Sequence, residues 1–290
     1  MAGFSAALPS ATTYVYDNGS TDATVSRAVE AGAVVRTEPL PGKGSVVRRM
    51  FADIDADVYV MADGDSTYDA SMAPILVNRL IDDDLDMVVG SRVGVTADAD
   101  RRGHAVGNRL FNALYRLLFG SGFADIFSGY RVFSRRFVKS FPAGFSGFEV
   151  ETEMSVHASQ LRLPVGEVEV SYQARPEGSE SKLRTVADGM NVLRAMFVLL
   201  KVNRPMALLG GISVVFAMAS ITLGVPVFVD FSRTGLVERL PTAVLATGLA
   251  VLALVSAVSG IIMDSIARVR LEGKRLAYLA QPAMTTNTHG

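Results

Sequence analysis

Val58-Tyr-Val-Met-Ala-Asp-Gly-Asp65 is an apolar run that ends in two aspartates one residue apart. The chain contains six Asp-x-Asp pairs, but only this one closes a short, wholly apolar segment. In an open α/β sheet, ligands bind just beyond the carboxyl ends of the strands. Hard divalent cations prefer oxygen ligands. Asp63 and Asp65 are therefore candidates to hold a cation against a diphosphate.

The composition excludes several kinds of chemistry. A length of 290 residues allows one large domain or two smaller ones. Cysteine is absent, which excludes disulfides, thiolate zinc sites and cysteine nucleophiles. A formal net charge of −1 provides no global basic field, so we expect no nucleic-acid partner. The mean hydropathy of +0.30 is high for a soluble protein, and its cause lies in the last third of the chain.

The first two thirds alternate short apolar runs with helical patterns. Strands are predicted at residues 12–16, 33–36, 58–62, 86–90, 130–133 and 165–172. Helices are predicted at residues 22–31, 45–54, 69–81, 107–119 and 148–161. This alternation predicts an α/β fold with a mostly parallel, helix-covered sheet. Asp17 ends the first of these strands, so it and the Asp63 turn can face one crevice, which suits a nucleotide diphosphate.

Two segments of the last third, 206–229 and 241–263, contain no charged residue and are long enough to cross a bilayer. Two buried core helices are the alternative, but uncharged runs of this length rarely occur in soluble domains. Because residues 230–240 form a short loop, a helical hairpin is expected. Basic residues flank the pair at both ends, and the positive-inside rule then places both termini in the cytoplasm. We expect a multi-pass protein of the cell membrane.

Four regions follow from these patterns. Residues 1–182 form the soluble domain, and residues 183–204 form an amphipathic helix on the membrane surface. Residues 205–264 contain the two spans, and residues 265–290 form a basic cytoplasmic tail. The lipid bilayer is thus one expected partner of the chain.

Six motifs occur in a fixed order along the soluble domain. They are Asp17-Asn-Gly-Ser-Thr-Asp22, Pro41-Gly-Lys-Gly44, Asp63-Gly-Asp65, Val88-Val-Gly-Ser-Arg92, Ser128-Gly-Tyr-Arg131 and Arg175-Pro-Glu-Gly-Ser-Glu-Ser-Lys182. Over roughly residues 5–200 the chain resembles the family 2 glycosyltransferases. The order and spacing are most similar to polyprenyl-phosphate hexosyltransferases, of the dolichyl-phosphate mannose synthase and bacterial undecaprenyl-phosphate glucosyltransferase type. The resemblance implies a GT-A, Rossmann-like domain before the membrane hairpin.

The resemblance also implies roles for the residues that would bind the donor. Asp63 and Asp65 would coordinate Mg²⁺ or Mn²⁺ on the diphosphate of a nucleotide sugar. Asp17 would contact the base or ribose, or it would simply close its strand in an Asx-turn. Lys43 would contact the nucleotide or its phosphates, or it would be a solvated lysine in a turn.

A second set of residues would serve the acceptor and the reaction. By resemblance, Arg92 and Arg131 hold the phosphate of a polyprenyl phosphate, and Arg175 and Lys182 lie on a mobile loop over the diphosphate. Surface salt bridges are the alternative for each. Asp125 would lie nearest the anomeric carbon and position groups, or it would be a structural acid paired with Arg131.

Three glutamates, Glu149, Glu151 and Glu153, occur within one predicted helix. Because Glu149 and Glu153 are four residues apart, they share a face. Either one of these acids lines the pocket or the three form a solvated helix surface.

These expectations define a membrane enzyme. It would transfer a hexose from UDP-glucose or GDP-mannose to polyprenyl phosphate on the cytoplasmic leaflet, with inversion, for cell-envelope glycan or glycoprotein synthesis. Alternatives are a glycosyltransferase that acts directly on a polysaccharide, and a non-catalytic membrane scaffold. A homo-oligomer is compatible with the resemblance.

The start of the chain departs from the family pattern. The family domain opens with an apolar strand that ends in a Pro-x-Tyr-Asn-Glu-like turn, whereas Met1-Ala-Gly-Phe-Ser-Ala-Ala-Leu8 resembles the helix after it. We therefore expect the first strand to be absent. Its neighbours would then lack a row of backbone hydrogen bonds.

Overall fold

A computed structural model describes residues 1–93, 123, 125–147, 149–171, 194 and 197–283. The chain divides into two compact units. The first comprises Met1–Leu193 and Gly273–Gly290, and the second comprises Arg194–Glu272. Each unit is described by itself below.

The described strands of the first unit form two sheets. They are β1 (Tyr14–Asp17), β2 (Val34–Thr37), β3 (Val58–Met61), β4 (Met87–Val93), β5 (Arg131–Ser134) and β6 (Val165–Ser171). β1 pairs with β2 in parallel, and the other four are ordered β3-β5-β4-β6. β5 is antiparallel to both neighbours, with Val132 opposite Val60 on one side and Val88 on the other. The α/β prediction is confirmed, but β5 makes the larger sheet mixed.

Seven described helical elements accompany these strands. They are α1 (Ala2–Ala7), α2 (Thr24–Glu30), α3 (Lys43–Asp53), the 3-10 turn η1 (Ala70–Met72), α4 (Ala73–Asp82), α6 (Arg135–Ser140) and α7 (Val150–Leu161). The sequence pattern did not predict α6, which is only six residues long. It begins directly after β5 because the Ser134 hydroxyl accepts a hydrogen bond from the Phe137 N–H at 3.1 Å.

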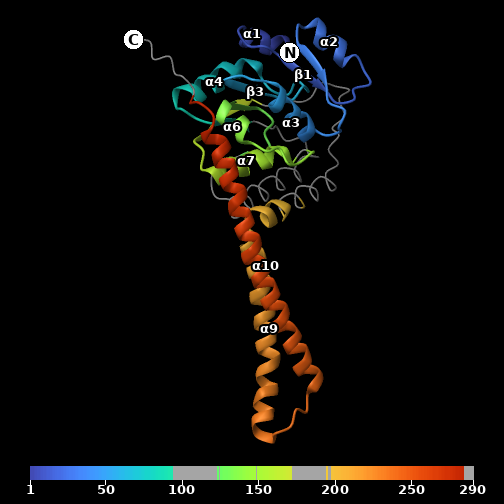
Figure 1. Cartoon of the computed structure of the whole chain (residues 1–290). Helices are drawn as coiled ribbons and strands as arrows, with labels where there is room; N and C mark the ends of the chain where they lie inside the picture. Colours follow the sequence, from blue (N-terminus) through green and yellow to red (C-terminus); the bar gives the residue numbers. More distant parts are fainter. Residues whose placement is uncertain (94–122, 124, 148, 172–193, 195–196, 284–290) are drawn as a thin grey trace. The chain divides into compact units, whose positions relative to one another are not determined.

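Alternation along β5 builds the core on both faces of the larger sheet. Val132 packs with Leu76 and Leu80 of α4 on one face. Phe133 points to the other face, where ring centroids lie 5.7 Å from Phe51 of α3 and 4.8 Å from Phe137 of α6. Figure 1 shows α4 on one side of these strands and α6 and α7 on the other. This layered core fixes the strand ends from which the polar turns project.

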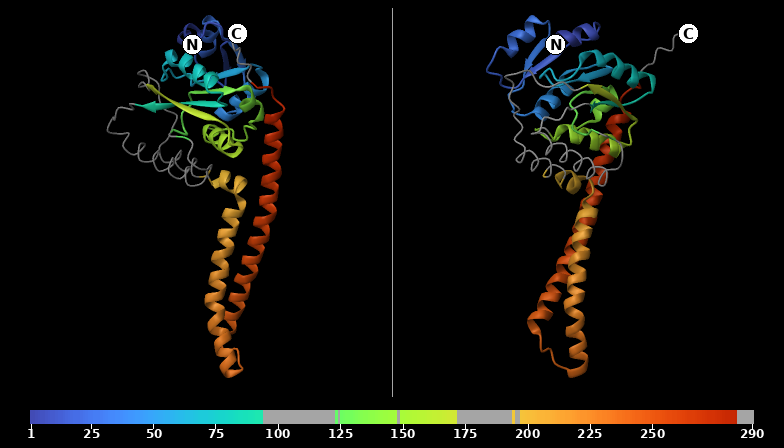
Figure 2. Two further views of the ribbon diagram at one scale, coloured as in Figure 1. Left: turned by 90° about the vertical axis from the view of Figure 1, so that its left-hand side faces the viewer. Right: turned by 180° about the vertical axis from the view of Figure 1, so that it is seen from behind.

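The second unit contains two long apolar helices, α9 (Pro205–Thr234) and α10 (Leu240–Leu279). Each includes a window of mean hydropathy 2.3, and the two predicted spans lie inside them. Figure 2 shows them side by side and antiparallel. The Ser213 hydroxyl donates to the Ala253 carbonyl and the Ser220 hydroxyl to the Ala246 carbonyl, each at 2.7 Å. Length and composition therefore suit a membrane hairpin.

The residues predicted as a basic tail begin as helix. α10 continues to Leu279, and its last turns belong to the first unit. There the Tyr278 hydroxyl donates to Asp86 at 2.8 Å, and Lys274 donates to Gln160 at 3.0 Å. The Arg136 guanidinium lies 5.4 Å from the centre of the Tyr278 ring. The end of the helix is thus docked at the amino-terminal end of β4.

Candidate functional site

The two aspartates of the predicted cation site occupy the turn that follows β3. Asp63 keeps 35% of its side chain exposed. Asp65 accepts hydrogen bonds from the N–H and the hydroxyl of Thr67, at 3.3 and 2.6 Å. This Asx-type closure shapes the turn locally. The structure therefore places both carboxylates where the sequence predicted them, at the carboxyl end of a strand.

Lys43 connects this turn to a distant helix. Its ammonium forms ion pairs with Asp63 and with Glu151 of α7. The lysine starts α3 directly after Gly42, two residues before the predicted helix start. Burial works against the charged form, but the two carboxylates outweigh it and raise the Lys43 pKa. Lys43 is therefore a partly buried, charged lysine paired with two carboxylates rather than a solvated lysine in a turn, and its contact with the nucleotide stays a prediction.

Glu151 is the member of this cluster that the sequence pattern did not single out. Only 4% of the residue is exposed, and its Oε2 atom has no hydrogen-bond partner. Burial raises the pKa of this carboxyl, and the Lys43 ammonium opposes that shift. Of the two readings of the three glutamates, the solvated surface is wrong for Glu151. Its apolar neighbours Val150 and Met154, which are also buried, were the available signal.

Glycine at position 44 allows a second backbone segment to approach Lys43. The Gly44 N–H donates to the Ser146 carbonyl at 2.9 Å. A Cβ atom at this position would lie 2.0 Å from the Phe145 carbonyl oxygen, which excludes any side chain without a shift of backbone. Glu153 holds the approaching loop, because its carboxylate accepts from the N–H groups of Gly144 and Phe145 at 2.9 and 3.1 Å. Glu153 is thus a structural acid.

Asp17 closes β1 as the alternative reading predicted. Its carboxylate accepts from the N–H groups of Gly19 and Ser20, at 3.3 and 3.1 Å. Hydrogen bonds from Ser20 and then Gly19 lower the pKa of this exposed carboxyl. The Asx-turn is present, and contact with the base or ribose stays a prediction.

Asn18 joins the end of β1 to the segment that precedes Lys43. Its side-chain amide donates to the carbonyls of Glu38 and Leu40, at 2.7 and 2.8 Å. Its oxygen accepts from the Gly42 N–H at 2.8 Å. These three bonds make Asn18 the residue that sets the position of the lysine turn. The Asx and glycine composition predicted a turn there, but not these longer-range contacts.

Arg92 and Asp125 form a bidentate pair. The Nε and Nη2 atoms of Arg92 lie 2.6 and 2.9 Å from the two carboxylate oxygens of Asp125. Burial opposes ionisation of Asp125, but Arg92 and the Phe127 N–H hold its pKa below the usual range. The alternative role for Asp125 was a structural acid paired with Arg131, and the ion pair that the structure shows is with Arg92. A place for Asp125 near the anomeric carbon stays a prediction.

Arg131 is completely buried in the structure. Its guanidinium donates to the carbonyls of Ser128 and Ile126, at 2.9 and 2.8 Å, and to the Ser155 hydroxyl of α7 at 3.0 Å. These contacts brace the turn before β5 against α7. The structure thus gives Arg131 a structural role in place of the predicted contact with the acceptor phosphate.

Tyr68 lies near the charged side chains of both Asp63 and Arg92. Its hydroxyl accepts from the Gly129 N–H at 2.9 Å. Burial raises the Tyr68 pKa, while the charge of Arg92 lowers it and that of Asp63 raises it. A Cβ atom on Gly129 would lie 2.5 Å from Asp63 Oδ2, so a side chain there would displace the Asp63 carboxylate. The Ser-Gly-Tyr-Arg motif therefore packs against the Asp63 turn through Gly129.

The donor chemistry at the Asp63 turn suits a hard divalent cation. Asp63 and Asp65 offer carboxylate oxygens, the ligand type that Mg²⁺ takes together with substrate phosphates. The Oε2 atom of Glu151, nearby, is buried without a hydrogen-bond partner, so the Lys43 cluster has a carboxylate oxygen to which no donor is bound. Within the described residues, no group of three or more acidic, histidine or cysteine side chains surrounds one point. Any cation held here would depend on ligand oxygens as well.

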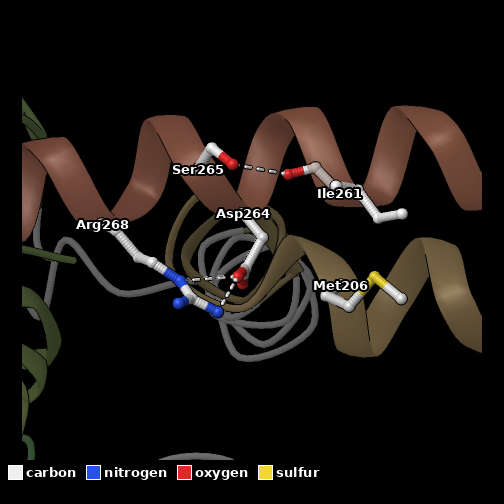
Figure 3. Close-up of a pocket in the computed structure, with 5 residues that line it drawn as sticks. All are labelled: Met206, Ile261, Asp264, Ser265 and Arg268. Atoms are coloured by element: carbon white, nitrogen blue, oxygen red, sulfur yellow. Dashed lines mark hydrogen bonds and ion pairs between the residues drawn. The ribbon is translucent and has the colours of Figure 1, made fainter.

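Two predicted site residues, Arg175 and Lys182, lie outside the described residues, as does most of the predicted amphipathic helix. The pocket in Figure 3 belongs to the second unit and has a volume of about 440 Å³. Its charged groups pair with each other, since Arg268 donates to Asp264 at 2.9 Å. It contains none of the predicted site residues.

Comparison with known proteins agrees with this geometry. Residues 11–141 match the family model described as glycosyl transferase family 2. Glycosyltransferase AglJ of Haloferax volcanii is 35% identical over 219 residues, which cover 75% of this chain and 71% of AglJ. Dolichyl-phosphate hexose transferase of the same organism is 28% identical over 172 residues, which cover 59% of this chain and 74% of that protein.

The fold also matches a solved structure. Glucosyl-3-phosphoglycerate synthase from Mycobacterium tuberculosis, in complex with Mn²⁺, UDP-glucose and phosphoglyceric acid, aligns with a TM-score of 0.51 and 24% identity. The alignment covers 64% of this chain and 67% of the synthase. A likeness at this identity shows the GT-A-like fold alone. The identity to AglJ and the match to the family model establish that this chain is a glycosyltransferase and belongs to glycosyl transferase family 2.

Proposed function

We propose that this enzyme transfers a hexose from a nucleotide-diphosphate sugar, UDP-glucose or GDP-mannose, to a polyprenyl phosphate. The observation that carries the proposal is the charged cluster of Lys43, Asp63 and Glu151 at a strand end, in a chain with two helices apolar enough to cross a membrane. The name of the dolichyl-phosphate hexose transferase supports the acceptor. The synthase complex with UDP-glucose and Mn²⁺ supports the donor class.

The donor would bind along the ends of β1 and β3. Asp17 would take the base or ribose, and the Lys43 ammonium would face the diphosphate. Asp63 and Asp65 would hold Mg²⁺ or Mn²⁺, which supplies positive charge against the charge that grows on the leaving nucleoside diphosphate.

The acceptor phosphate would meet Arg92, because a guanidinium fork matches phosphate oxygens. Asp125 fixes the plane of that fork through its two hydrogen bonds. Arg175 and Lys182 would cover the diphosphate. A phosphate oxygen of the lipid forms the new bond to the anomeric carbon while the bond to the diphosphate oxygen breaks, which inverts the configuration. Because the phosphate nucleophile is already ionised near neutral pH, no general base is required.

The two apolar helices would anchor the enzyme in the cell membrane. The basic residues on both sides of the hairpin favour a cytoplasmic soluble domain and cytoplasmic termini. The donor is water-soluble and the acceptor headgroup lies at the membrane surface, so this orientation brings both substrates to one site. The lipid-linked sugar would then supply cell-envelope glycan or glycoprotein synthesis.

Membranes that contain the full chain test the proposal. With polyprenyl phosphate, Mn²⁺ and either labelled UDP-glucose or labelled GDP-mannose, one donor should give an acid-labile labelled lipid. Asp65→Ala should abolish the labelling. Asp82→Ala is the matched control, because Asp82 begins another Asp-x-Asp pair but lies exposed on α4.

Labelling of polysaccharide in place of lipid would support the glycosyltransferase alternative and overturn the lipid acceptor. No labelled product from either donor, with wild-type protein that is folded by circular dichroism, would overturn the proposal and favour the scaffold alternative.

A further inference from the structure

The Lys43 cluster contains more negative than positive groups. One ammonium lies between the carboxylates of Asp63 and Glu151. Glu151 is the deeper of the two acids, and its second oxygen has no partner. Buried polar atoms are normally hydrogen-bonded, so such an exception calls for an explanation.

The two carboxylates differ in what else they can do. Asp63 is partly exposed and belongs to the turn proposed to hold the cation. Glu151 is enclosed in α7, where flanking residues are buried. A metal cation that binds at Asp63 must compete there with the Lys43 ammonium. The same cation cannot reach the buried Glu151 carboxylate unless Lys43 moves.

From this asymmetry we propose that Glu151 is a positioning residue that retains the Lys43 ammonium when Asp63 takes up its cation. The inference deepens the proposed function and rests on its donor site. Without a ligand, Lys43 bridges both acids. When the cation arrives with the nucleoside diphosphate, Lys43 gives up Asp63 but stays on Glu151. The ammonium is then held next to the diphosphate, where its charge is needed.

Hydrogen bonds hold the backbone in place on both sides of Lys43. The Gly44 N–H is bonded to the Ser146 carbonyl, and Asn18 holds the Gly42 N–H at 2.8 Å. The turn itself is therefore anchored on both sides. Only the long side chain of Lys43 remains to redistribute between its two partners.

A double-mutant cycle on the detergent-solubilised full chain tests the inference, with Mn²⁺ plus UDP or GDP followed by isothermal titration calorimetry. Glu151→Gln should weaken binding of the Mn²⁺–nucleotide pair about tenfold, and Lys43→Met about as much. The double variant should also lose about tenfold, because Glu151 acts only through Lys43. Additive losses, about a hundredfold in the double variant, would overturn the inference.

Mn²⁺ alone provides a readout that a merely structural role would not produce. In Glu151→Gln the ammonium rests on Asp63 alone, so Mn²⁺ should bind severalfold more weakly. In Lys43→Met the competitor is gone, so Mn²⁺ should bind more tightly. Glu151→Asp should restore part of the wild-type affinity, and Glu30→Gln, an exposed acid on α2, should change nothing. Equal Mn²⁺ affinity in Glu151→Gln and wild type would contradict the inference.

Lys43→Met leaves the buried Glu151 carboxylate without its ammonium, and Glu151→Gln leaves Lys43 with Asp63 alone, so a single variant can lose stability. The double variant removes both charges, so its comparison with wild type remains informative. Coupled nucleotide binding without any labelled lipid would sustain the inference while the proposed acceptor fails. Labelled lipid with additive effects would sustain the proposed function alone, and no binding of Mn²⁺ with either nucleotide would overturn both.

Discussion

Two acidic groups at opposite ends of the larger sheet are equally buried, yet their surroundings differ. Glu151 and Asp86 each expose 4% of the residue. Asp86, at the amino end of β4, accepts from the Ser134 hydroxyl at 2.6 Å and from the Tyr278 hydroxyl at 2.8 Å, one on each oxygen. Glu151 shares a lysine with Asp63 and leaves one oxygen without a partner.

The difference indicates which end of the sheet is built for a ligand. Neutral donors satisfy both oxygens of Asp86, so the group is complete without anything from solution. At the carboxyl end, the single ammonium of Lys43 pairs with two carboxylates, and the Oε2 atom of Glu151 has no partner. We infer that the contacts at the amino end serve only the structure of the fold. The carboxyl end gains hydrogen-bond and ionic partners when the nucleotide sugar binds.

The largest effect should come from the carboxyl end. Asp65→Ala should lower the rate of sugar transfer about 10²–10³-fold, the scale seen when one electrostatic group is removed from an active site. The free energy of unfolding should change far less than the barrier to transfer, because the carboxylate accepts hydrogen bonds from Thr67 within its own turn. Initial rates at saturating donor measure the effect, with Asp82→Ala as control. A rate within threefold of wild type would show that Asp65 is not part of the machinery.

The amino end should respond in stability instead. Asp86→Ala removes the acceptor of two hydroxyl groups, which should cost about 1–3 kcal/mol of unfolding free energy. Pulse proteolysis in urea measures this loss. The transfer rate per folded molecule should stay within twofold of wild type. If activity fell in step with Asp65→Ala, the two ends would not be functionally distinct.

A third effect concerns acid stability and involves α7, the helix that supplies Glu151. His157 is buried between Phe137 and Phe141, and burial lowers its pKa to about 3. Since the unfolded-state pKa is about 6.5, only the unfolded chain gains this proton as the pH falls from 6.5 toward 3. This linkage should make the domain about 2 kcal/mol less stable at pH 5 than at pH 7.

Unfolding free energies of wild type and His157→Gln at both pH values isolate this contribution. The variant should be less stable at pH 7, because the ring packing is lost, but should show a smaller decrease on acidification. An identical pH slope in both proteins would mean that His157 is not the linked group.

The smallest effect should follow from Tyr278→Phe. It removes one hydroxyl donor to Asp86 and keeps the ring over which Arg136 lies. The expected loss is about 1 kcal/mol. A double variant with Asp86→Ala should cost no more than Asp86→Ala alone. Additive losses would show that Tyr278 stabilises the amino end of β4 through its ring rather than through its hydroxyl.

Local patterns in the sequence predicted much of the fold. Strong apolar runs such as Val58–Met61 and the two long uncharged segments were identified correctly as a strand and as helices. The antiparallel direction of β5 was not predictable. The direction of a strand depends on the path of the connection before it, and the local pattern of apolar residues does not contain that path. The short α6 helix was missed because its start depends on a cap by Ser134, and a single serine is a weak signal.

The candidate site was predictable where residues are adjacent in sequence. Asp63 and Asp65 could be identified because they directly follow an apolar run that predicts a strand. Glu151 did not, because its importance comes from a lysine that is 108 positions away in the sequence. The same holds for Arg131, where sequence order suggested a ligand contact and tertiary packing made the guanidinium an internal brace.

The division of the chain has a consequence for biosynthesis. The second unit, Arg194–Glu272, is inserted between two parts of the first. Synthesis proceeds from the amino terminus, so the ribosome completes both uncharged segments, 206–229 and 241–263, before it makes Tyr278. Of the two hydroxyl groups that donate to Asp86, that of Tyr278 is therefore made last. A nascent chain arrested before residue 273 would carry every described strand of the first unit but lack the segment that contacts Asp86 at the amino end of β4.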